Sequence, residues 1–563
     1  MRRASQRIVQ LRGACPLPLN ASRSRYTAVT AQRSARAGCL RTAISSYFGH
    51  REYSSHAALE SSSGSVNGSR TTPHSPAAST ATITSEADRP DHRDIATEQE
   101  LFTVSEFSPG SPLILPNGAH IMNKLITFLR AQYMQYGFRE VLTPNIYKKS
   151  LWQISGHWQN YKDDMYAVFP GTDTPTSHNH DSGSAEAYET AIDKEDREGY
   201  GLKPMNCPGH CLLMRSKRHT YKEMPVRYAD FSALHRNEVS GSLSGLTRVR
   251  RFHQDDAHIF CRPHQISTEI EAQLKFTETV LSVFGLKDYR LALSTRPERD
   301  FIGTVEMWDD AEHQLTQALD NAGKTWTVNE GDGAFYGPKI DLQLKDSDGK
   351  YHQLSTIQLD MNLPKRFGIG YITAPGEPDY TPSTPTDGPY IQTPVLIHRA
   401  IFGSLERFFA ILIEHYNTRW PLWLSFHQGI ILTVNDGKKL NQAAQEAASQ
   451  MSGFASGPGE VALSPTIPTF KVDIDGSSQT LAKKIVAAKK KRYNFIFVLG
   501  PKNLEDGTVD VDFAGQAATK GAQNIEKFLD GMDIVSFNGD TKRMKVKTKD
   551  IYGLFLKLER AFQ

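Results

Sequence analysis

The segment VRRFHQDDAHIF, residues 249–260, follows RYADFSALHR, residues 227–236, after a Gly- and Ser-rich loop, NEVSGSLSGLTR. Two strand-like segments joined by such a loop predict a long antiparallel hairpin. The second segment concentrates two adjacent carboxylates between histidines and an amide. It therefore raises three possibilities, namely a metal site, an acid–base pair, or a polar strand on the surface.

Side chains alternate between the two faces of a strand, so Asp255 and Asp256 must point apart. The two carboxylates are therefore not expected to act as a catalytic pair, and Asp255 is expected to tolerate substitution better than Asp256. A strand with two polar faces is the plain alternative. An aromatic, an amide, a carboxylate and an imidazole in line suit the floor of a concave site instead. The residues expected on that face are Arg250, Phe252, Gln254, Asp256 and His258.

The 563 residues are too many for a single hydrophobic core, so two or three domains are expected. A content of 39% hydrophobic and 23% charged residues is ordinary for a globular protein. The sequence contains no run of about 18 apolar residues, the length that a membrane span requires, so no membrane partner is expected. The five cysteines form no disulfide framework in a chain of this size, which indicates a reducing compartment or metal binding by a few thiols.

The net charge of +3 comes from the N-terminus, where residues 1–50 hold nine arginines and no acidic residue. The remainder carries 56 basic against 62 acidic residues, so no body-wide nucleic-acid footprint is expected. An Arg- and Ser-rich, acid-free start is typical of a mitochondrial transit peptide, which predicts the mitochondrial matrix; a disordered basic tail is the alternative. We place the transit peptide over residues 1–54 and a disordered linker, poor in large apolar residues, over residues 55–100.

Apolar residues at three- and four-residue spacing predict an amphipathic helix over residues 119–138, followed by a strand over 139–144 that ends at Pro144. Two polar, irregular stretches, residues 170–196 and 372–390, are expected to be surface insertions.

After Pro421 the pattern changes to strands alternating with helices. IILTVN, TFKVDID and NFIFVLG are expected strands, and LAKKIVAAKKK is an expected helix. This alternation predicts a small α/β domain with a mostly parallel sheet.

Three further segments carry reactive side chains: KPMNCPGHC (203–211), GAFYGPKIDLQL (333–344) and HRAIFGSLERFFAIL (398–412). Each has a plain alternative when taken alone, since a buried cysteine, a core histidine and a surface arginine are common.

Together these segments resemble class II aminoacyl-tRNA synthetases, and most closely the threonyl-tRNA synthetases, over about residues 101–535. The blocks that match in order are SPGSPLILPNG, SGHWQNYKDDMY, LKPMNCPGH, LHRNEVSGSLSGLTRVRRFHQDDAHIF, AFYGPKIDLQL, TIQLDMNLP and HRAIFGSLERF. The resemblance implies an α+β protein. Its parts are an antiparallel catalytic sheet with flanking helices over residues 101–424 and an α/β anticodon-binding domain over residues 425–563. It further implies a homodimer that uses threonine, ATP with Mg²⁺, and tRNA(Thr).

The family's zinc ligands match Cys207, His258 and His398. These positions are too far apart in sequence for a zinc finger, and three protein ligands leave a fourth position open for substrate. A closed structural cluster of Cys207, His210 and Cys211 is the rival site. In the family the zinc binds the amino group and the hydroxyl of threonine, which rejects valine where an apolar pocket would not.

The remaining expected site residues are carried over from the family's motifs, position by position. Around threonine they are Met205, Gln254, Asp256 and Tyr336. Around ATP they are Arg236, Glu238, Arg248, Phe252, Gln353, Ser404 and Arg407, with Arg236 and Arg407 as the catalytic arginines. The threonine carboxylate is already ionised at neutral pH, so its attack on the α-phosphate needs positioning and charge neutralisation rather than a general base.

His157 and Gln358 match residues that act when threonine moves to the terminal ribose of tRNA. A packing role for His157 is the alternative, although histidine suits proton transfer near neutral pH.

The chain departs from the family in two places. Family members often carry an N-terminal domain that hydrolyses mischarged seryl-tRNA; here the residues before the core resemble presequence and linker, so we expect no separate editing domain. In the C-terminal domain AGQAATKGAQN stands where the family often has a basic run. The Lys/Arg group at 488–492 is expected to contact phosphate or to be a solvated helix end.

Two other functions compete with threonine–tRNA ligation. A synthetase-derived binding or regulatory protein would have lost activity, but the three presumed ligands and both arginines are present. A prolyl- or seryl-type relative does not fit the set Cys207, His258 and His398.

Overall fold

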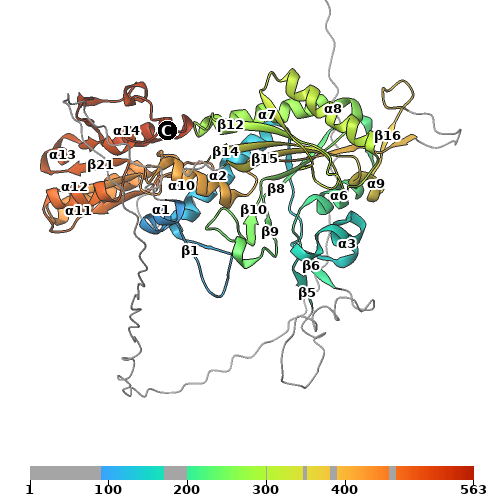
Figure 1. Ribbon diagram of the computed structural model, residues 1–563. Coiled ribbons are helices and arrows are strands. Elements are labelled where there is room, and N and C mark those ends of the chain that lie inside the picture. The colour runs from blue at the N-terminus through green and yellow to red at the C-terminus, as the bar shows by residue number, and fades with distance from the viewer. Residues whose placement is uncertain (1–90, 170–198, 300, 346–350, 381–389, 455–463) are drawn as a thin grey trace, which may run out of the picture. The chain divides into compact units, whose positions relative to one another are not determined.

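The structure is a computed structural model that describes residues 91–169, 199–299, 301–345, 351–380, 390–454 and 464–563 (Figure 1). The expected transit peptide (1–54), the linker as far as residue 90, the insertion at 170–196 and residues 381–389 of the second insertion lie outside the described residues.

The larger sheet has eight strands in the order β13-β12-β14-β15-β18-β11-β8-β3 (Figure 1). Among the described strands, five neighbouring pairs are antiparallel. The strand at each edge, β13 or β3, runs parallel to its single neighbour. The expected antiparallel sheet is therefore confirmed. Their bounds are β3 Arg139–Glu140, β8 Val226–Asp230, β11 Asp256–Cys261, β12 Tyr289–Ser294, β13 Trp326–Asn329, β14 Lys339–Lys345, β15 Tyr351–Asp360 and β18 Val395–Ala400.

The predicted hairpin is confirmed, in two parts. Its base is the antiparallel pair β8–β11, with Asp230 opposite Asp256. Its tip is a separate pair, β9 (Ala233–His235) and β10 (Arg251–His253), in which Phe252 lies opposite Leu234. The interruption between the two parts turns the tip out of the large sheet, so the tip forms a sheet of its own.

The helices packed on this sheet are α2 Pro116–Gln135, α7 Ile266–Val283, α8 Val305–Asn321 and α10 Leu405–Tyr416. The predicted helix at 119–138 is α2, which begins earlier because Pro116 occupies its first turn, where no backbone donor is needed. The strand expected at 139–144 is shorter than predicted. It ends at Glu140, because the Thr143 N–H donates to the Asp230 carboxylate (3.2 Å) instead of to a neighbouring strand.

The main hydrophobic core lies between the sheet and these helices. Tyr133 of α2, Phe276 of α7, Leu315 of α8 and Phe408 of α10 are buried in it together with Ile259 of β11. Burial of side chains from all these elements holds the helices and the sheet together as one unit, since apolar area removed from water is the main favourable contribution to folding.

Smaller elements surround the sheet. The helices are α3 Lys149–Ser155, α4 His157–Tyr161, α6 Cys207–Arg215 and α9 Leu363–Arg366. The strands are β1 Phe102–Thr103, β2 Leu113–Ile114, β4 Ile146–Lys148, β5 Ala167–Val168, β6 Tyr200–Leu202, β7 His219–Thr220, β16 Tyr371–Thr373 and β17 Tyr390–Gln392.

The C-terminal domain is built on a six-stranded sheet in the order β20-β19-β21-β22-β24-β23. Its strands are β19 Gly429–Thr433, β20 Val472–Asp475, β21 Phe495–Leu499, β22 Thr508–Asp512, β23 Ile534–Asn538 and β24 Arg543–Lys547. Its helices are α11 Lys438–Ser452, α12 Leu481–Lys490, α13 Pro501–Asp506, α14 Ala514–Ala517 and α15 Ile551–Arg560. Within the 488–492 group, Lys489 Nζ lies 3.0 Å from the Asp512 carboxylate.

The expectation that this sheet is mostly parallel is wrong. β19 pairs in parallel with β20 and β21, but β21–β22, β22–β24 and β23–β24 are antiparallel. A parallel crossover needs a dozen or more residues. The link between β21 and β22 holds only the short helix α13, so β22 returns antiparallel.

The expectation of disorder up to residue 100 is also wrong at its end. His92–Gln99 forms helix α1, capped by the Asp91 side chain, which accepts from the Arg93 and Asp94 N–H groups. Ile95 and Ala96 are buried in the main core. The apolar stripe of this helix is too short to stand out in a largely polar sequence.

Asp255 ties three segments together beneath the sheet. Its carboxylate accepts hydrogen bonds from the Tyr133 hydroxyl (2.7 Å), the Ile401 N–H (2.8 Å) and the Phe402 N–H (3.0 Å). The buried Arg399 guanidinium, stacked 4.1 Å from the Phe276 ring centroid, supplies the opposite charge. Burial raises the pKa of the Asp255 carboxyl to about 6. Asp255 does face away from Asp256. It is fully buried and its carboxylate accepts three hydrogen bonds, which argues against the expectation that it tolerates substitution.

Replacing Asp255 by Asn should lower the free energy of unfolding by about 2–3 kcal/mol, because an amide cannot accept from all three donors and leaves Arg399 without its counter-charge. Urea unfolding followed by tryptophan fluorescence measures this. Tyr133→Phe should cost about 1 kcal/mol. Asp256→Asn is the matched control and should leave stability unchanged. An Asp255→Asn protein as stable as the parent would contradict the role given to this carboxylate.

Candidate active site

One cavity opens over β11, β15 and β18, and its lining comes from segments far apart in the sequence. The expected site residues that line it are Met205, Cys207, Arg236, Glu238, Arg248, Phe252, Gln254, Asp256, His258, Tyr336, Gln353, Gln358, His398, Ser404 and Arg407. His157 is the expected site residue that does not. Arg250 does not line it either, because its guanidinium turns to the Glu238 carbonyl (2.8 Å).

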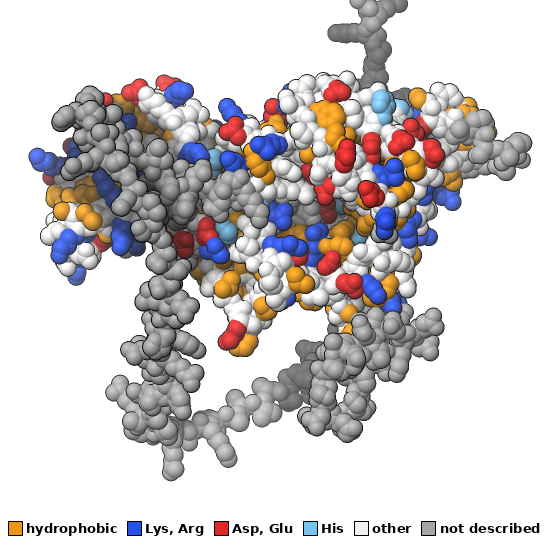
Figure 2. Space-filling model, viewed as in Figure 1, with side chains coloured by type: hydrophobic (Ala, Val, Ile, Leu, Met, Phe, Trp, Pro, Cys, Tyr) orange, Lys and Arg blue, Asp and Glu red, His pale blue; other side chains and the backbone are white. Residues whose placement is uncertain are grey.

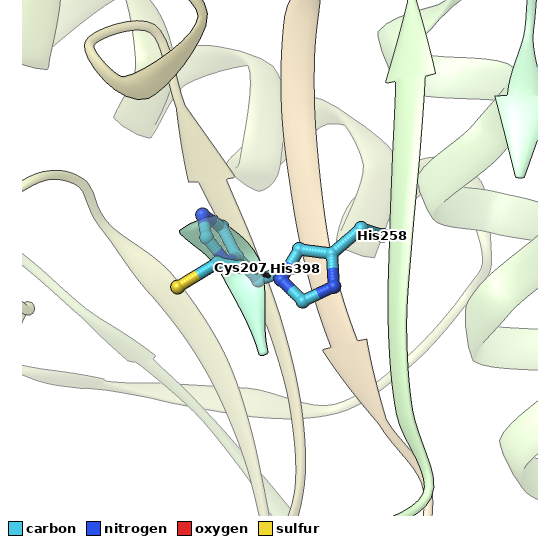
Figure 3. Close-up of side chains that lie close together, drawn as sticks. All are labelled: Cys207, His258 and His398. Atoms are coloured by element: carbon cyan, nitrogen blue, oxygen red, sulfur yellow. Dashed lines mark hydrogen bonds between the residues drawn. The ribbon is translucent and has the colours of Figure 1, made fainter. Parts of the chain in front are cut away.

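Three buried side chains that could hold a metal ion converge at one end of the cavity (Figure 3). Cys207 comes from α6, His258 from β11 and His398 from β18, and their ligand atoms lie within 4.8 Å of one another. The closest pair is His258 Nε2 and His398 Nδ1, at 2.9 Å. Burial, with His210 and His398 nearby, holds the pKa of His258 well below its usual value, so its imidazole is neutral, as a ligand must be.

The orientation of the His398 ring is set by the carboxylate of Asp360. Its Nε2 donates to Asp360 Oδ2 (2.9 Å), which leaves Nδ1 with a lone pair toward His258 and Cys207. The other oxygen of Asp360 is fixed by the N–H groups of Asn362 (2.7 Å) and Leu363 (3.0 Å) at the start of α9. A carboxylate behind a histidine ligand is the usual support of a metal site.

The rival cluster of Cys207, His210 and Cys211 does not form among the described residues. His210 packs edge-on against His258, with ring centroids 4.6 Å apart, and its Nε2 lies 3.8 Å from the Asp230 carboxylate. Cys211 is fully buried in an apolar cluster one helical turn from Cys207. Both residues pack behind the metal-binding group.

The cavity wall beside this group is polar. Asp256 Oδ1 lies 3.9 Å from His258 Nδ1, and burial raises the pKa of the Asp256 carboxyl. The Tyr336 ring packs on His398 at 5.1 Å between centroids. Gln254 forms an isolated β-bridge with Ser404, which joins the hairpin to the start of α10. A small ligand here meets a carboxylate, an amide and a phenol.

The other end of the cavity is cationic. Arg236 lies over the Phe252 ring at 5.0 Å, and Arg248 pairs with Glu238 at 2.8 Å. Burial lowers the pKa of Arg407, and the positive charges of Arg236 and Arg248 lower it further. Like charges so close disfavour one another unless an anion binds between them.

Arg407 is held by backbone carbonyls. Its Nε donates to Thr247 O (3.0 Å) and an Nη to Gln353 O (2.9 Å). The turn before it requires Gly403, whose φ is +61° and whose Cβ would lie 2.4 Å from Leu354 O. Ser404 then caps α10 by accepting from the Arg407 N–H (3.2 Å). The helix therefore starts directly at the cavity.

Two family models match the chain, the tRNA synthetase class II core domain (G, H, P, S and T) over residues 188–416 and an anticodon binding domain over residues 428–531. A probable mitochondrial threonine–tRNA ligase from Schizosaccharomyces pombe is 46% identical over 425 residues, which cover 75% of this chain and 84% of that one. The chain belongs to the threonyl-tRNA synthetase family.

Other relatives agree. The human cytoplasmic threonine–tRNA ligase 1 is 45% identical over 76% of this chain, which spans about half (52%) of that relative's length. The solved RNA binding domain of threonyl-tRNA synthetase from Cryptosporidium parvum is 35% identical, with a TM-score of 0.67, over 83% of this chain and 98% of that one. The predicted family and fold class, a class II core with an anticodon-binding domain, are therefore confirmed.

The surface of this chain is not strongly basic on the face shown in Figure 2, where acidic, basic and apolar side chains are interspersed. No described helix is long and apolar enough to cross a membrane.

His157 lies behind the cavity wall in this family member. Its Nδ1 is 2.8 Å from Ser155 Oγ, and its Nε2 is 3.1 Å from Met205 Sδ. Burial lowers the pKa of its imidazole to about 3. Gln358, by contrast, lines the cavity and donates to Gly337 O (3.1 Å).

Sequence reasoning missed three buried carboxylates of the synthetase core. Asp360 holds His398, and Glu406 accepts from the His253 N–H (2.9 Å). Asp341 accepts from the Gln353 amide (2.5 Å). An acidic residue in the first turn of α10 is a detectable signal for Glu406. The contacts of Asp360 with His398 and of Asp341 with Gln353 join different strands, so no local pattern in the sequence indicates them.

Asp360→Asn should weaken metal binding about 10–100-fold, because an amide N–H facing His398 Nε2 forces the proton onto Nδ1. Metal retained after dialysis against a graded chelator series measures this. Asp341→Asn is the matched control, a buried aspartate on β14 outside the metal-binding group. Equal metal retention in both variants would contradict the orienting role of Asp360.

Proposed function

We propose that the chain ligates threonine to tRNA(Thr) in two steps, formation of threonyl-adenylate from threonine and ATP, then transfer to the terminal ribose of the tRNA. The observation that carries this proposal is a single cavity with a Cys–His–His group at one end and three arginines at the other. An amino acid at the first end and a triphosphate at the second would meet between them. Family membership supports the assignment.

The donor set fits zinc, since one thiol and two imidazoles, whose ligand atoms here lie within 4.8 Å of one another, are typical zinc ligands. We propose Cys207, His258 and His398 as the ligands. When bound, zinc supplies a Lewis-acid position that takes the amino group and hydroxyl of threonine and disfavours valine. Burial raises the pKa of the Cys207 thiol, which is unfavourable for a thiolate unless a cation is present.

The chain's own residues would complete the amino-acid pocket. Asp256 would accept a hydrogen bond from the threonine hydroxyl; its position in the cavity lining beside His258 supports this role. Gln254 and Tyr336 would contact the amino group, and Met205 would close the apolar side.

For adenylate formation, the arginines would position and neutralise the phosphates of ATP, which arrives with Mg²⁺. Arg236 is proposed for the α-phosphate and the threonine carboxylate, and Arg407 for the γ-phosphate. Phe252 would lie under adenine. Glu238, Arg248, Gln353 and Ser404 would make the remaining nucleotide contacts.

For transfer, we propose Gln358 as the contact on the cavity side. His157 would act through Met205, because its Nε2 meets the Met205 sulfur rather than open space. The proposed domain limits are 101–424 for catalysis and 425–563 for the anticodon, to which α1 adds a short N-terminal support.

The proposed location is the mitochondrial matrix. The name of the Schizosaccharomyces pombe relative and the Arg-rich, acid-free composition of residues 1–50 support it. We also propose a homodimer, as the family resemblance implies.

Threonine-dependent ATP–pyrophosphate exchange tests the assignment. Cys207→Ser should lose both bound zinc and exchange, because a hydroxyl is a poor zinc ligand. Cys211→Ser is the matched control, since Cys211 is a buried cysteine of the same helix outside the group, and it should keep both. Zinc is measured by elemental analysis. Threonine-dependent exchange that survives in Cys207→Ser would refute the zinc assignment.

Serine should be activated measurably by the same protein, and valine hardly at all. Serine keeps the hydroxyl, so a zinc site accepts it, and the missing methyl is worth only about 1–3 kcal/mol, or roughly 10–200-fold in kcat/KM. Exchange kinetics with the three amino acids give the ratios. Complete indifference to serine at high concentration would show that another feature of the pocket rejects it.

A further inference from the structure

Helix α1 reaches the loop at the tip of the hairpin through one side chain, His92. The Leu246 N–H, in that loop, donates to His92 Nε2 (3.2 Å). His92 Nδ1 lies 3.1 Å from the Glu414 carboxylate on α10, which also accepts the His92 backbone N–H (3.2 Å). The imidazole is therefore a bridge between α10 and the hairpin loop.

The chemistry of the bridge allows one tautomer. A backbone N–H can only donate, so His92 Nε2 must present a lone pair to Leu246. The ring proton then sits on Nδ1 and donates to Glu414. The contact with Leu246 is buried, since His92 is 5% exposed and Leu246 fully buried, so it would be costly to leave unmade. The contact with Glu414 is part-buried.

A glycine in the loop makes room for this ring. Gly245 has a φ of +45°, and a Cβ there would lie 2.2 Å from His92 Nε2. Any other residue at 245 would push the imidazole away. Gly245 therefore marks the close approach of α1 independently of the hydrogen bonds.

The loop that His92 supports forms part of the cavity wall. Thr247, the residue after Leu246, gives its carbonyl to Arg407 Nε (3.0 Å), and Arg248 follows. The loop is thus fixed to α10 at two points, directly by Arg407 and through His92 by Glu414. These two residues are seven apart, two turns along one face of the helix.

We propose that His92 is a positioning residue for ATP binding. It holds the hairpin loop against α10, so that the Thr247 carbonyl fixes Arg407 and Arg248 faces the phosphates. It touches no substrate itself. The inference rests on the proposed function of this cavity as the ATP site. It assigns a role in that site to helix α1, which precedes the segments that resemble the family.

The test compares KM for ATP and KM for threonine in pyrophosphate exchange. His92→Phe keeps the ring and removes both hydrogen bonds, and it should raise KM for ATP about tenfold while KM for threonine stays within about twofold. His92→Gln should restore most of the ATP affinity, because its amide oxygen can accept from Leu246. Glu98→Gln, on the exposed side of α1, is the control and should match the parent.

The outcomes separate the two proposals. A parent protein with no threonine-dependent exchange would refute the proposed function. An active parent with an unchanged KM for ATP in His92→Phe, or with both KM values raised equally, would overturn the positioning role alone.

A double-mutant cycle adds a second readout. Gly245→Ala alone should raise KM for ATP severalfold, because its Cβ displaces the imidazole. In a His92→Ala background the same change should have a much smaller effect, since the clash is gone. Strictly additive effects would contradict the proposed contact.

Discussion

The site depends on the register between β11 and β18. This antiparallel pairing sets His258 directly opposite His398, and the next pairing sets Gln358 opposite His398 on the other side. A slip of one residue would turn one histidine to the far face of the sheet and break up the group of Cys207, His258 and His398. The register is itself fixed on the far face, where Asp255 accepts from the Ile401 and Phe402 N–H groups just beyond β18.

The two faces of this strand segment therefore have different roles, one in the cavity and one in the core. Asp256 and His258 face the cavity, whereas Asp255 faces the core and joins helix α2 to the turn that begins α10. Other buried carboxylates also connect separate segments. Asp360 orients His398, and Glu406 accepts a hydrogen bond from the His253 N–H. Each is strongly constrained, because removing one partner of a buried charge costs more than the pair contributes.

Much of this was accessible from the sequence. The hairpin, helix α2 and the first strands of the C-terminal sheet follow from local periodicity and turn residues, which are properties of short segments. The expected site residues were carried over from matching motifs, and the structure gathers all of them except His157 around one cavity. The predictions that were wrong concern long-range packing. Helix α1 has only a short apolar stripe, and β22 returns antiparallel to β21 because the link between them holds only the short helix α13.

By itself, the sequence determined the family, the order of the elements and the identity of the chemically active side chains, because these are encoded in residue type and spacing. Only the tertiary structure decided which of two adjacent aspartates is held in the core, which nitrogen of His398 is free, and that His92 meets the hairpin loop. Those outcomes depend on strand pairing and packing between residues more than 30 positions apart, for which no local pattern carries a signal.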